Sequence, residues 1–463
     1  MRTRLAAVSV LAVLGAAAVA LSPAAAAGAA PDPAFTNTPL IVTGPLPPGV
    51  TTAPNANSLG NSEPGIAFAK DGSMAIDSLT SLPQVNLWQG HFGATPAYFG
   101  GMDAGLSNTG VGRTTSGGAD ADVEFTSAGT ILLADLNVIL NRNGRGFQIG
   151  VNATRCPAGT AAPSDCTHTF IDTAGADRPW ITTAGTNAWL AYHDSKNSSL
   201  IRVKRSTDDG KTWSAAGSPI PGQGPATADA TFNNYIGPIV ADPGTGVVYE
   251  SYAAGEPQTK AKSSDHNNIY VSRSADGGEH WTSTLVFHAP PFTRLNNFFP
   301  SLAVDPVTHA VYTAWTDQHG IAVSQSTDGG VTWSPAVTVS TIQTTVMPSV
   351  AARNGKVDVV YYGSTAASID DTAAVWNAYD SQFSNGAWAV KQVSNTPNRV
   401  GAVCLEGSGC VNNVNRELLD LFEVAEDPVS GKAAVIYADS TIDTWTANGV
   451  TKELPEIVLA FEQ

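Results

Sequence analysis

One eight-residue pattern, Ser-x-Asp-x-Gly-x-Thr-Trp, occurs three times and constrains the fold of this chain more than any other feature. The residues before each copy have the composition and alternation of a β-strand, and the Asp stands where the chain must reverse. A short carboxylate can accept backbone N–H groups within a turn, Gly supplies a backbone with positive φ, and Trp returns to the sheet. Each copy therefore predicts a β-hairpin. The copies begin at Ser206, Ser274 and Ser326, and the second has His280 in place of Thr.

A second repeated phrase lies upstream of the turns and consists of a strand, a tight turn and another strand. Its clearest copies begin at Pro238 and Pro300. The two phrases together give four strands a module, and antiparallel four-stranded modules repeated around an axis form a β-propeller. We predict an all-β fold of seven blades, with six as the alternative, in which residues 457–461 join the first blade and close the ring. The modules start near residues 64, 122, 179, 238, 300, 348 and 421.

The amino terminus has the pattern of a secretory signal peptide. Arg2 and Arg4 precede an apolar run, and small residues follow at positions 24–27. The run is about long enough to span a bilayer, which takes roughly 17–25 residues, but the small residues favour cleavage. We therefore predict a secreted, extracellular protein without a membrane span. Its expected parts are a signal peptide over 1–27, a linker rich in Pro, Ala, Asn and Thr over 28–60, and a single propeller domain over 61–463.

The four cysteines form two close pairs, Cys156 with Cys166 and Cys404 with Cys410. Outside the cytoplasm, such pairs predict two disulfides that close short loops. A zinc site is the alternative, but the pairs lack the tight spacing of zinc knuckles. We expect no metal site and no cofactor, because no Gly-rich phosphate loop follows a strand into a helix.

The charge balance excludes one class of partner. The chain has 24 Lys and Arg against 40 Asp and Glu, a formal net charge of −16. Nucleic-acid binding needs a basic face, so we expect no nucleic-acid partner. An acidic surface keeps a secreted protein soluble, and we expect a monomer.

The three turns resemble the Asp box, or bacterial neuraminidase repeat, of the sialidase superfamily. The residues match closely in the three turns, and the regular spacing of the strand and turn patterns extends the resemblance over roughly residues 60 to 463. It implies a propeller that is an exo-acting glycoside hydrolase on extracellular glycans, with its pocket on the face opposite the boxes. Because a fold does not determine a reaction, two alternatives stay open. One is a non-catalytic propeller that binds glycan or protein, and the other is a different carbohydrate-active enzyme, such as another hydrolase or a lyase.

Charged residues interrupt the apolar starts of the first strands of several modules, and they are the candidate site. A sialidase needs an arginine cluster for the substrate carboxylate, a Tyr nucleophile assisted by Glu, and an Asp acid/base. The Arg-Ile-Pro phrase of the family is missing here, and other arginines would have to serve. We assign catalytic roles to Glu63, Asp122, Tyr361 and Glu417, and substrate binding to Arg178, Arg416 and Asp177.

Overall fold

The computed structural model describes thirteen stretches of the chain, and the predicted signal peptide lies outside them. Residues 34–463 form one compact unit. Its described part consists of strands and two short 3-10 turns, and none of its helices is long and apolar enough to cross a membrane. The described residues are 34–42, 60–80, 85–102, 113–140, 147–172, 175–194, 200–220, 234–255, 266–290, 293–295, 298–410, 415–447 and 450–463.

The strands form seven antiparallel sheets in the order that the repeats predict. The first three blades are β2 (Asn61–Phe68), β3 (Ser73–Thr80), β4 (Val85–His91) and β5 (Ala97–Gly101); β6 (Arg113–Phe125), β7 (Ile131–Leu140), β8 (Phe147–Cys156) and β9 (Thr167–Asp172); and β10 (Ala176–Ala184), β11 (Asn187–Asp194), β12 (Ile201–Ser206) and β13 (Ser214–Ala215). The fourth and fifth are β14 (Asn234–Ala241), β15 (Val248–Ala254), β16 (Asn268–Ser274) and β17 (Thr282–His288); and β18 (Ser301–Val304), β19 (Val311–Thr316), β20 (Ile321–Ser326) and β21 (Val337–Ser340).

The sixth and seventh blades differ slightly from the others. The sixth has β22 (Thr344–Arg353), β23 (Lys356–Ser364), β24 (Val375–Ser384) and β25 (Ala387–Gln392), and β26 (Arg399–Val400) pairs with β24. The seventh has β27 (Glu423–Glu426), β28 (Ala433–Ala447), β29 (Val450–Glu462) and β1 (Phe35–Leu40).

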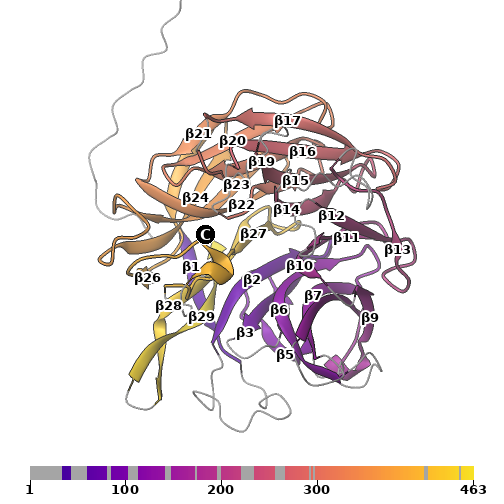
Figure 1. Cartoon of the computed structure of the whole chain (residues 1–463), viewed down its shortest axis with the longest axis horizontal. Coiled ribbons are helices and arrows are strands. Elements are labelled where there is room, and N and C mark those ends of the chain that lie inside the picture. Colours follow the sequence, from indigo (N-terminus) through magenta and orange to yellow (C-terminus); the bar gives the residue numbers. More distant parts are fainter. Residues whose placement is uncertain are drawn as a thin grey trace, which may run out of the picture. The chain divides into compact units, whose positions relative to one another are not determined.

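The first strand of each blade contacts the first strand of the next, and β27 returns to β2, so the ring closes. Figure 1 shows these inner strands gathered toward the middle of the sheets. The prediction of seven blades is therefore confirmed.

The ring closes differently from the sequence prediction. Strand β29 pairs with β28 and with β1, where Phe35 faces Glu462 and Leu40 faces Ile457. The last strand thus belongs to the seventh blade, and the prediction that it joins the first blade is wrong. Residues 35–40, placed in the linker from their composition, form the outer strand of that blade. Pro39 is tolerated there because an edge strand can lose a ladder hydrogen bond.

The Asp boxes fold on their own side chains. Asp208 accepts hydrogen bonds from Thr212 N at 2.9 Å and Thr212 Oγ1 at 2.7 Å, and these bonds lower the pKa of its carboxyl to about 2. Ser206 Oγ accepts the N–H of Gly210, whose φ is +78°. In the second box, His280 Nδ1 takes the place of the Thr hydroxyl, 2.7 Å from Asp276 Oδ2. The three boxes are turn-forming elements, as predicted.

Strand pairing places the boxes and the candidate site at opposite ends of a blade. In the third blade, Asp177 of β10 pairs with His193, whereas Ser206, which starts the box, pairs with Ala188 at the other end of β11. We call the end that carries the starts of the inner strands the site face.

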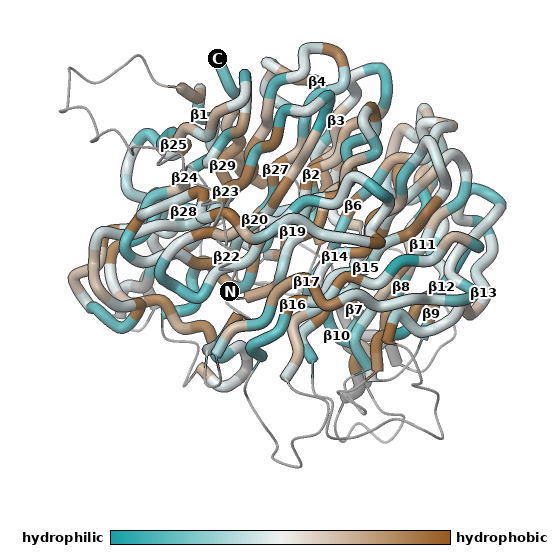
Figure 2. The backbone as a smooth tube through the Cα atoms, turned by 90° about the horizontal axis from the view of Figure 1, so that it is seen from above, coloured by the Kyte–Doolittle hydropathy of each residue, from teal (hydrophilic) through white to brown (hydrophobic). Residues whose placement is uncertain are grey.

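Large aromatic side chains fill the spaces in and between blades. Their buried members are concentrated in the second and third strands, and Figure 2 shows hydrophobic segments lying within the strands. Aromatic residues recur near the ends of the second strands and pack in the core. They are Tyr192, Tyr252, Trp315 and Tyr437, all at most 2% exposed.

Gly237, in the inner strand of the fourth blade, is a point where two blades approach closely. A Cβ at Gly237 would overlap Pro300 O of the fifth blade and Ser251 Oγ, which donates to that same oxygen at 3.0 Å. We expect Gly237→Ala to lower the free energy of unfolding by about 3 kcal/mol, the upper part of the overpacking range, as measured by urea denaturation. Gly93→Ala, where the added Cβ meets open space at a φ of +78°, is the control and should cost about 1 kcal/mol. Equal losses would contradict the close approach.

Candidate functional site

A bulge in the inner strands directs side chains out of the ladder. The pairing shifts between Ser62 and Gly65 in β2 and between Asp177 and Trp180 in β10, at the repeated Pro. The residues before these prolines have left-handed backbones, with φ of +49° at Glu63 and +45° at Arg178. Bulges of this kind re-aim a side chain, and left-handed non-glycine residues gather at functional sites. The same shift recurs in β14 and β22, where Met347 also has a positive φ of +56°, so this bulge is a feature of the repeat. Glu63 and Arg178 are the charged residues that it carries in the first and third blades.

Arg178 is the centre of the arrangement. The residue is only 3% exposed, and its guanidinium carbon lies 4.3 Å from the centre of the Trp180 ring and 5.5 Å from that of Phe299. Its Nη1 lies 3.8 Å from Glu63 Oε2 and 3.9 Å from Asp120 Oδ2. Among the described residues, its Nε, Nη1 and Nη2 have no hydrogen-bond acceptor. A buried guanidinium without acceptors is costly unless a ligand satisfies it.

Arg178 opens into a cavity of about 440 Å³ on the site face, which we call the rim pocket. Arg416 Nη2 lies 2.9 Å from Asp420 Oδ2 in its wall. The lining combines acids, two arginines and aromatic rings from the second, third, fourth, fifth and seventh blades and the segments that precede their inner strands. Its residues are Asp120, Asp177, Arg178, His193, Asn234, Tyr235, Ile236, Phe298, Phe299, Glu406, Gly407, Arg416 and Asp420.

Glu63 lies behind the rim pocket. It is 1% exposed, its Oε1 accepts the backbone N–H of Asp420 at 3.0 Å, and its Oε2 faces Arg178. Glu63 thus holds the guanidinium on one side and the chain of Asp420 on the other. This placement suits a positioning residue and not the catalytic contact assigned to it from the sequence.

Burial and like charges raise the pKa values of the carboxyl groups around the pocket. Burial, together with the negative charges of Asp120 and Asp420, raises the pKa of Glu63 well above its usual value. Asp177 reaches solvent at the rim, yet partial desolvation and then the charge of Asp120 raise its pKa to about 6. Burial raises the pKa of Asp420 against the opposing charge of Arg416. A carboxyl group whose pKa is raised toward neutral pH, as that of Asp177 is, can donate or accept a proton there.

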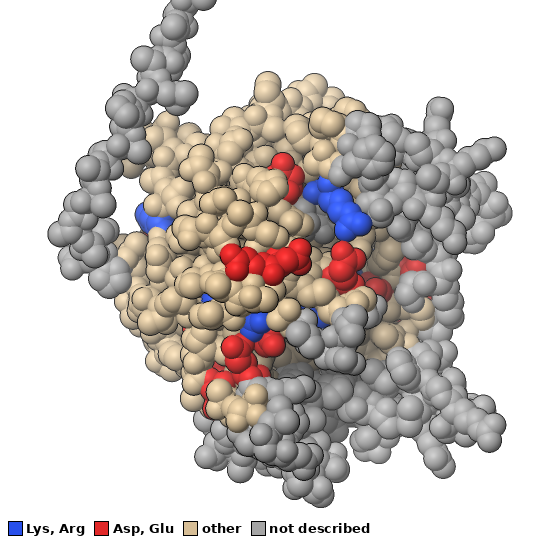
Figure 3. All heavy atoms as spheres, turned by 60° about the vertical axis from the view of Figure 1, so that its left-hand side comes forward, with Lys and Arg blue, Asp and Glu red and all other residues tan. Residues whose placement is uncertain are grey.

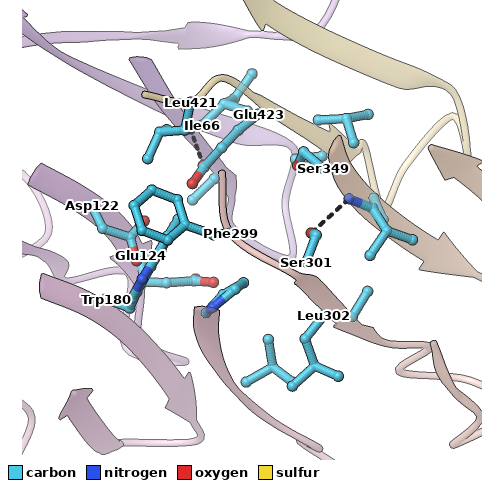
Figure 4. Close-up of a pocket in the computed structure, with 18 of the residues that line it drawn as sticks. Ile66, Asp122, Glu124, Trp180, Phe299, Ser301, Leu302, Ser349, Leu421 and Glu423 are labelled. Atoms are coloured by element: carbon cyan, nitrogen blue, oxygen red, sulfur yellow. Dashed lines mark hydrogen bonds between the residues drawn. The ribbon is translucent and has the colours of Figure 1, made fainter. Parts of the chain in front are cut away.

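A second cavity of about 280 Å³ lies along the inner strands of all seven blades, and we call it the central channel. Phe299 and Asp420 line both cavities, so the two adjoin. Figure 4 shows carboxylates in the channel close to the Trp180 and Phe299 rings. Asp122 Oδ2 accepts the N–H of Ile181 at 2.7 Å, and burial raises its pKa to about 7. No group of three or more metal-ligating side chains is placed to hold an ion within the described stretches.

The structure does not bring every sequence-assigned residue to the rim pocket. Arg178, Arg416 and Asp177 line it, whereas Asp122 lines the channel. Tyr361 is fully buried in β23, stacked on Tyr379 with ring centres 5.9 Å apart, and burial raises its pKa to about 12. This environment is unsuited to a nucleophile. The repeat does not report which side of a blade a residue faces, so the sequence could not show that the Tyr361 side chain packs in the core.

Glu417 is held away from the pocket as well. Its Oε2 lies 2.9 Å from Arg399 Nη1, and its carbonyl accepts the hydroxyl of Ser62. Arg399 also pairs with Glu453 of the seventh blade. Glu417 therefore anchors the segment that carries Arg416, which argues against the catalytic role assigned to it.

Sequence reasoning missed three aromatic members of the site. Tyr235, Phe298 and Phe299 line the rim pocket, and Phe299 also contacts Arg178. All three lie within three residues of a repeated Pro, at Pro238 or Pro300. Their position next to a repeated Pro could have indicated the site, but aromatic residues at this position are equally compatible with the hydrophobic core.

The Cys404–Cys410 disulfide closes the loop that supplies Glu406 and Gly407 to the pocket wall, and the predicted pairing is confirmed for both cysteine pairs. We expect the Cys404→Ser/Cys410→Ser variant to bind a ligand of the rim pocket several-fold more weakly, because the wall loses its cross-link. The Cys156→Ser/Cys166→Ser variant is the matched control, since its loop contributes nothing to the pocket. It should lower thermal stability and leave affinity unchanged. Equal affinities of both variants in titration calorimetry would contradict this role.

Comparison with known proteins supports the fold. Residues 178–368 match the family model described as a BNR repeat-like domain, and this range spans all three Asp boxes. No curated protein sequence matches the chain. The chain is similar in structure to the polysaccharide lyase PL25-ulvan lyase, with a TM-score of 0.50 and 12% identity over 86% of this chain and 91% of that chain.

Two sialic-acid enzymes are also similar. The Hadza microbial sialidase Hz136 has a TM-score of 0.43 and 13% identity, over 65% of this chain and 63% of that chain. The intramolecular trans-sialidase from Ruminococcus gnavus has a TM-score of 0.41 and 13% identity, over 87% and 94%. At these identities the likeness concerns the fold alone.

Proposed function

We propose that this propeller, which carries the BNR repeats of the sialidase superfamily, is a secreted glycoside hydrolase that acts on the ends of extracellular glycans. One observation supports it most: the buried Arg178 guanidinium, without hydrogen-bond acceptors among the described residues, faces a cavity walled by carboxylates. A concave site with a few convergent polar groups is the usual form of a small-ligand site.

The carboxylates supply the chemistry that glycosidic cleavage needs. Hydrolysis takes one carboxylic acid that protonates the leaving oxygen and one carboxylate that activates water or attacks the anomeric carbon. Asp177, whose pKa is raised to about 6, suits the acid, and Asp120 or Asp420 suits the second role. Arg178 and Arg416 would orient the sugar.

Release of 4-methylumbelliferone from a panel of fluorogenic glycosides, the sialoside included, tests the proposal. Wild-type protein should release the fluorophore with saturation, and activity should fall as the pH rises through about 6, because Asp177 must be protonated. Asp177→Asn should lower kcat at least about 100-fold, the lower end of general acid catalysis. Asp317→Asn, at an exposed position in the fifth blade, is the control and should leave kcat unchanged. Folded wild type that releases nothing would contradict hydrolysis and leave two alternatives, a lyase and a non-catalytic, glycan-binding propeller.

His193 and Tyr235 favour a second candidate, a lyase that cleaves uronate-containing polysaccharides. Both side chains line the rim pocket beside Arg178. Imidazole and phenol can remove and return protons, and a guanidinium can bind a uronate carboxylate. Such an enzyme would generate an unsaturated product, which is followed by its ultraviolet absorbance.

A further inference from the structure

The charge of the rim pocket bears on its substrate class, and it differs from what a carboxylate clamp requires. Both arginines of the lining are already faced by carboxylates: Arg178 by Glu63 and Asp120, and Arg416 by Asp420 at 2.9 Å. Arg178 thus has two carboxyl groups within 4 Å, and Arg416 has one.

The other described charged residues around the pocket add no unpaired positive charge to it. Asp177 is an additional acid at the rim. Arg294, outside the lining, lies 3.3 Å from Glu406 of the pocket wall. The described lining therefore has more acids than bases. Figure 3 shows one face of the molecule, on which Asp and Glu form several groups beside a few Lys and Arg.

Three more carboxyl groups lie near Arg178. The guanidinium lowers the pKa values of Asp77, Asp122 and Glu423, but burial raises them by more, so these groups keep protons and offset little of its charge. The acids of the lining therefore decide the balance. A carboxylate-bearing sugar would meet Asp120, Asp177 and Asp420 beside the two guanidiniums, and like charges in a partly desolvated site repel strongly.

The same pocket suits a neutral sugar ring. Arg178 offers Nε, Nη1 and Nη2, and Arg416 offers Nη1, all without acceptors among the described residues, while Asp420 Oδ1 has no donor there. A sugar hydroxyl both donates and accepts, so neighbouring hydroxyls can bridge a guanidinium and a carboxylate. Phe298 and Phe299, with ring centres 5.7 Å apart, add an apolar wall for the face of a ring.

We infer that the rim pocket takes a neutral terminal sugar and rejects sugars that carry a carboxylate, such as sialic and uronic acids. The inference rests on the proposed function, because it requires that the pocket bind glycan. It separates this protein from the substrate class that the sialidase resemblance implies.

The test is binding of the fluorescently labelled mature protein, at pH 7.5, to an array that pairs acidic with neutral terminal sugars of the same ring and linkage. Glucuronides are paired with glucosides, and galacturonides with galactosides; sialosides are included. The expected result is binding to a neutral member, with the acidic partner at least tenfold weaker in follow-up calorimetry. Asp177→Asn removes one negative charge from the exposed rim and should narrow that gap severalfold by strengthening binding of the acidic partner.

The outcomes separate this inference from the proposed function. Tighter binding of an acidic member would overturn the inference and leave a glycan-binding pocket in place. An unchanged gap in Asp177→Asn would overturn the electrostatic explanation. Binding to no sugar at all would remove the proposed function together with the inference.

Discussion

Replacing Arg178 by Ala is expected to weaken glycan binding at least about 100-fold, since it removes two or more charge-assisted hydrogen bonds of roughly 1.5–3 kcal/mol each. The guanidinium lies beside the edge-to-face pair of Trp180 and Phe299, 4.3 and 5.5 Å from the ring centres, so its direction is fixed before a ligand arrives. Little entropy is lost when it binds. Arg178→Lys keeps the charge but loses the planar fork, and we expect it to recover only a small part of the affinity.

Arg205 provides a matched control in the same blade. It also lies over a tryptophan, with its guanidinium carbon 5.8 Å from the centre of the Trp189 ring, but at the Asp-box end. Arg205→Ala should change glycan affinity less than twofold while costing comparable packing. Thermal unfolding of both variants separates loss of binding from loss of fold. Equal affinity of Arg178→Ala and wild type would show that the rim pocket is not the binding site.

The second large effect is a loss of stability as the pH rises. Burial raises the pKa of Asp122 to about 7 and that of Glu124 to about 8, from ordinary values of 3.8 and 4.5. Between pH 5 and 8 the folded protein therefore keeps protons that the unfolded chain has released, and raising the pH favours unfolding. At about 1.4 kcal/mol for each pKa unit, we expect the free energy of unfolding to fall by at least about 2 kcal/mol over this range.

Urea denaturation at pH 5, 6.5 and 8 measures the slope. Glu124→Gln removes one of the titrating groups and should flatten it. Asp208→Asn is the control, because the pKa of Asp208 is lowered to about 2 by its turn hydrogen bonds and Asp208 does not titrate in this range. That variant should be less stable by a similar amount at every pH. Stability that rises from pH 5 to 8 would contradict the protonation of the channel carboxyls.

The repeats predicted the architecture because every blade has the same order of four antiparallel strands and turns. The three boxes report a hairpin through short-range bonds, as between Asp208 and Thr212, which need no tertiary context. Blade number and strand starts followed from the spacing of the repeats. Ring closure did not, because pairing of β1 with β29 joins residues more than 400 positions apart and has no local signal.

The site was only partly predictable for a related reason. Glu63 and Arg178 were recognisable because they are charged at a position, just before the repeated Pro, that is apolar in most modules. The structure places their side chains 3.8 Å apart. The sequence could not show that Tyr361 and Glu417 lie away from the rim pocket, because a repeat gives the position of a residue along a blade but not the direction of its side chain. Direction here depends on bulges and on ion pairs such as that of Glu417 with Arg399.

A crystal structure of the protein soaked with the tightest-binding oligosaccharide from the array tests the central claim most directly. We predict a sugar ring in the rim pocket, with hydroxyl groups within hydrogen-bonding distance of Arg178 and Asp420 and one face against Phe299. Sugar bound at the Asp-box end or between outer strands, with the rim pocket empty, would contradict the account.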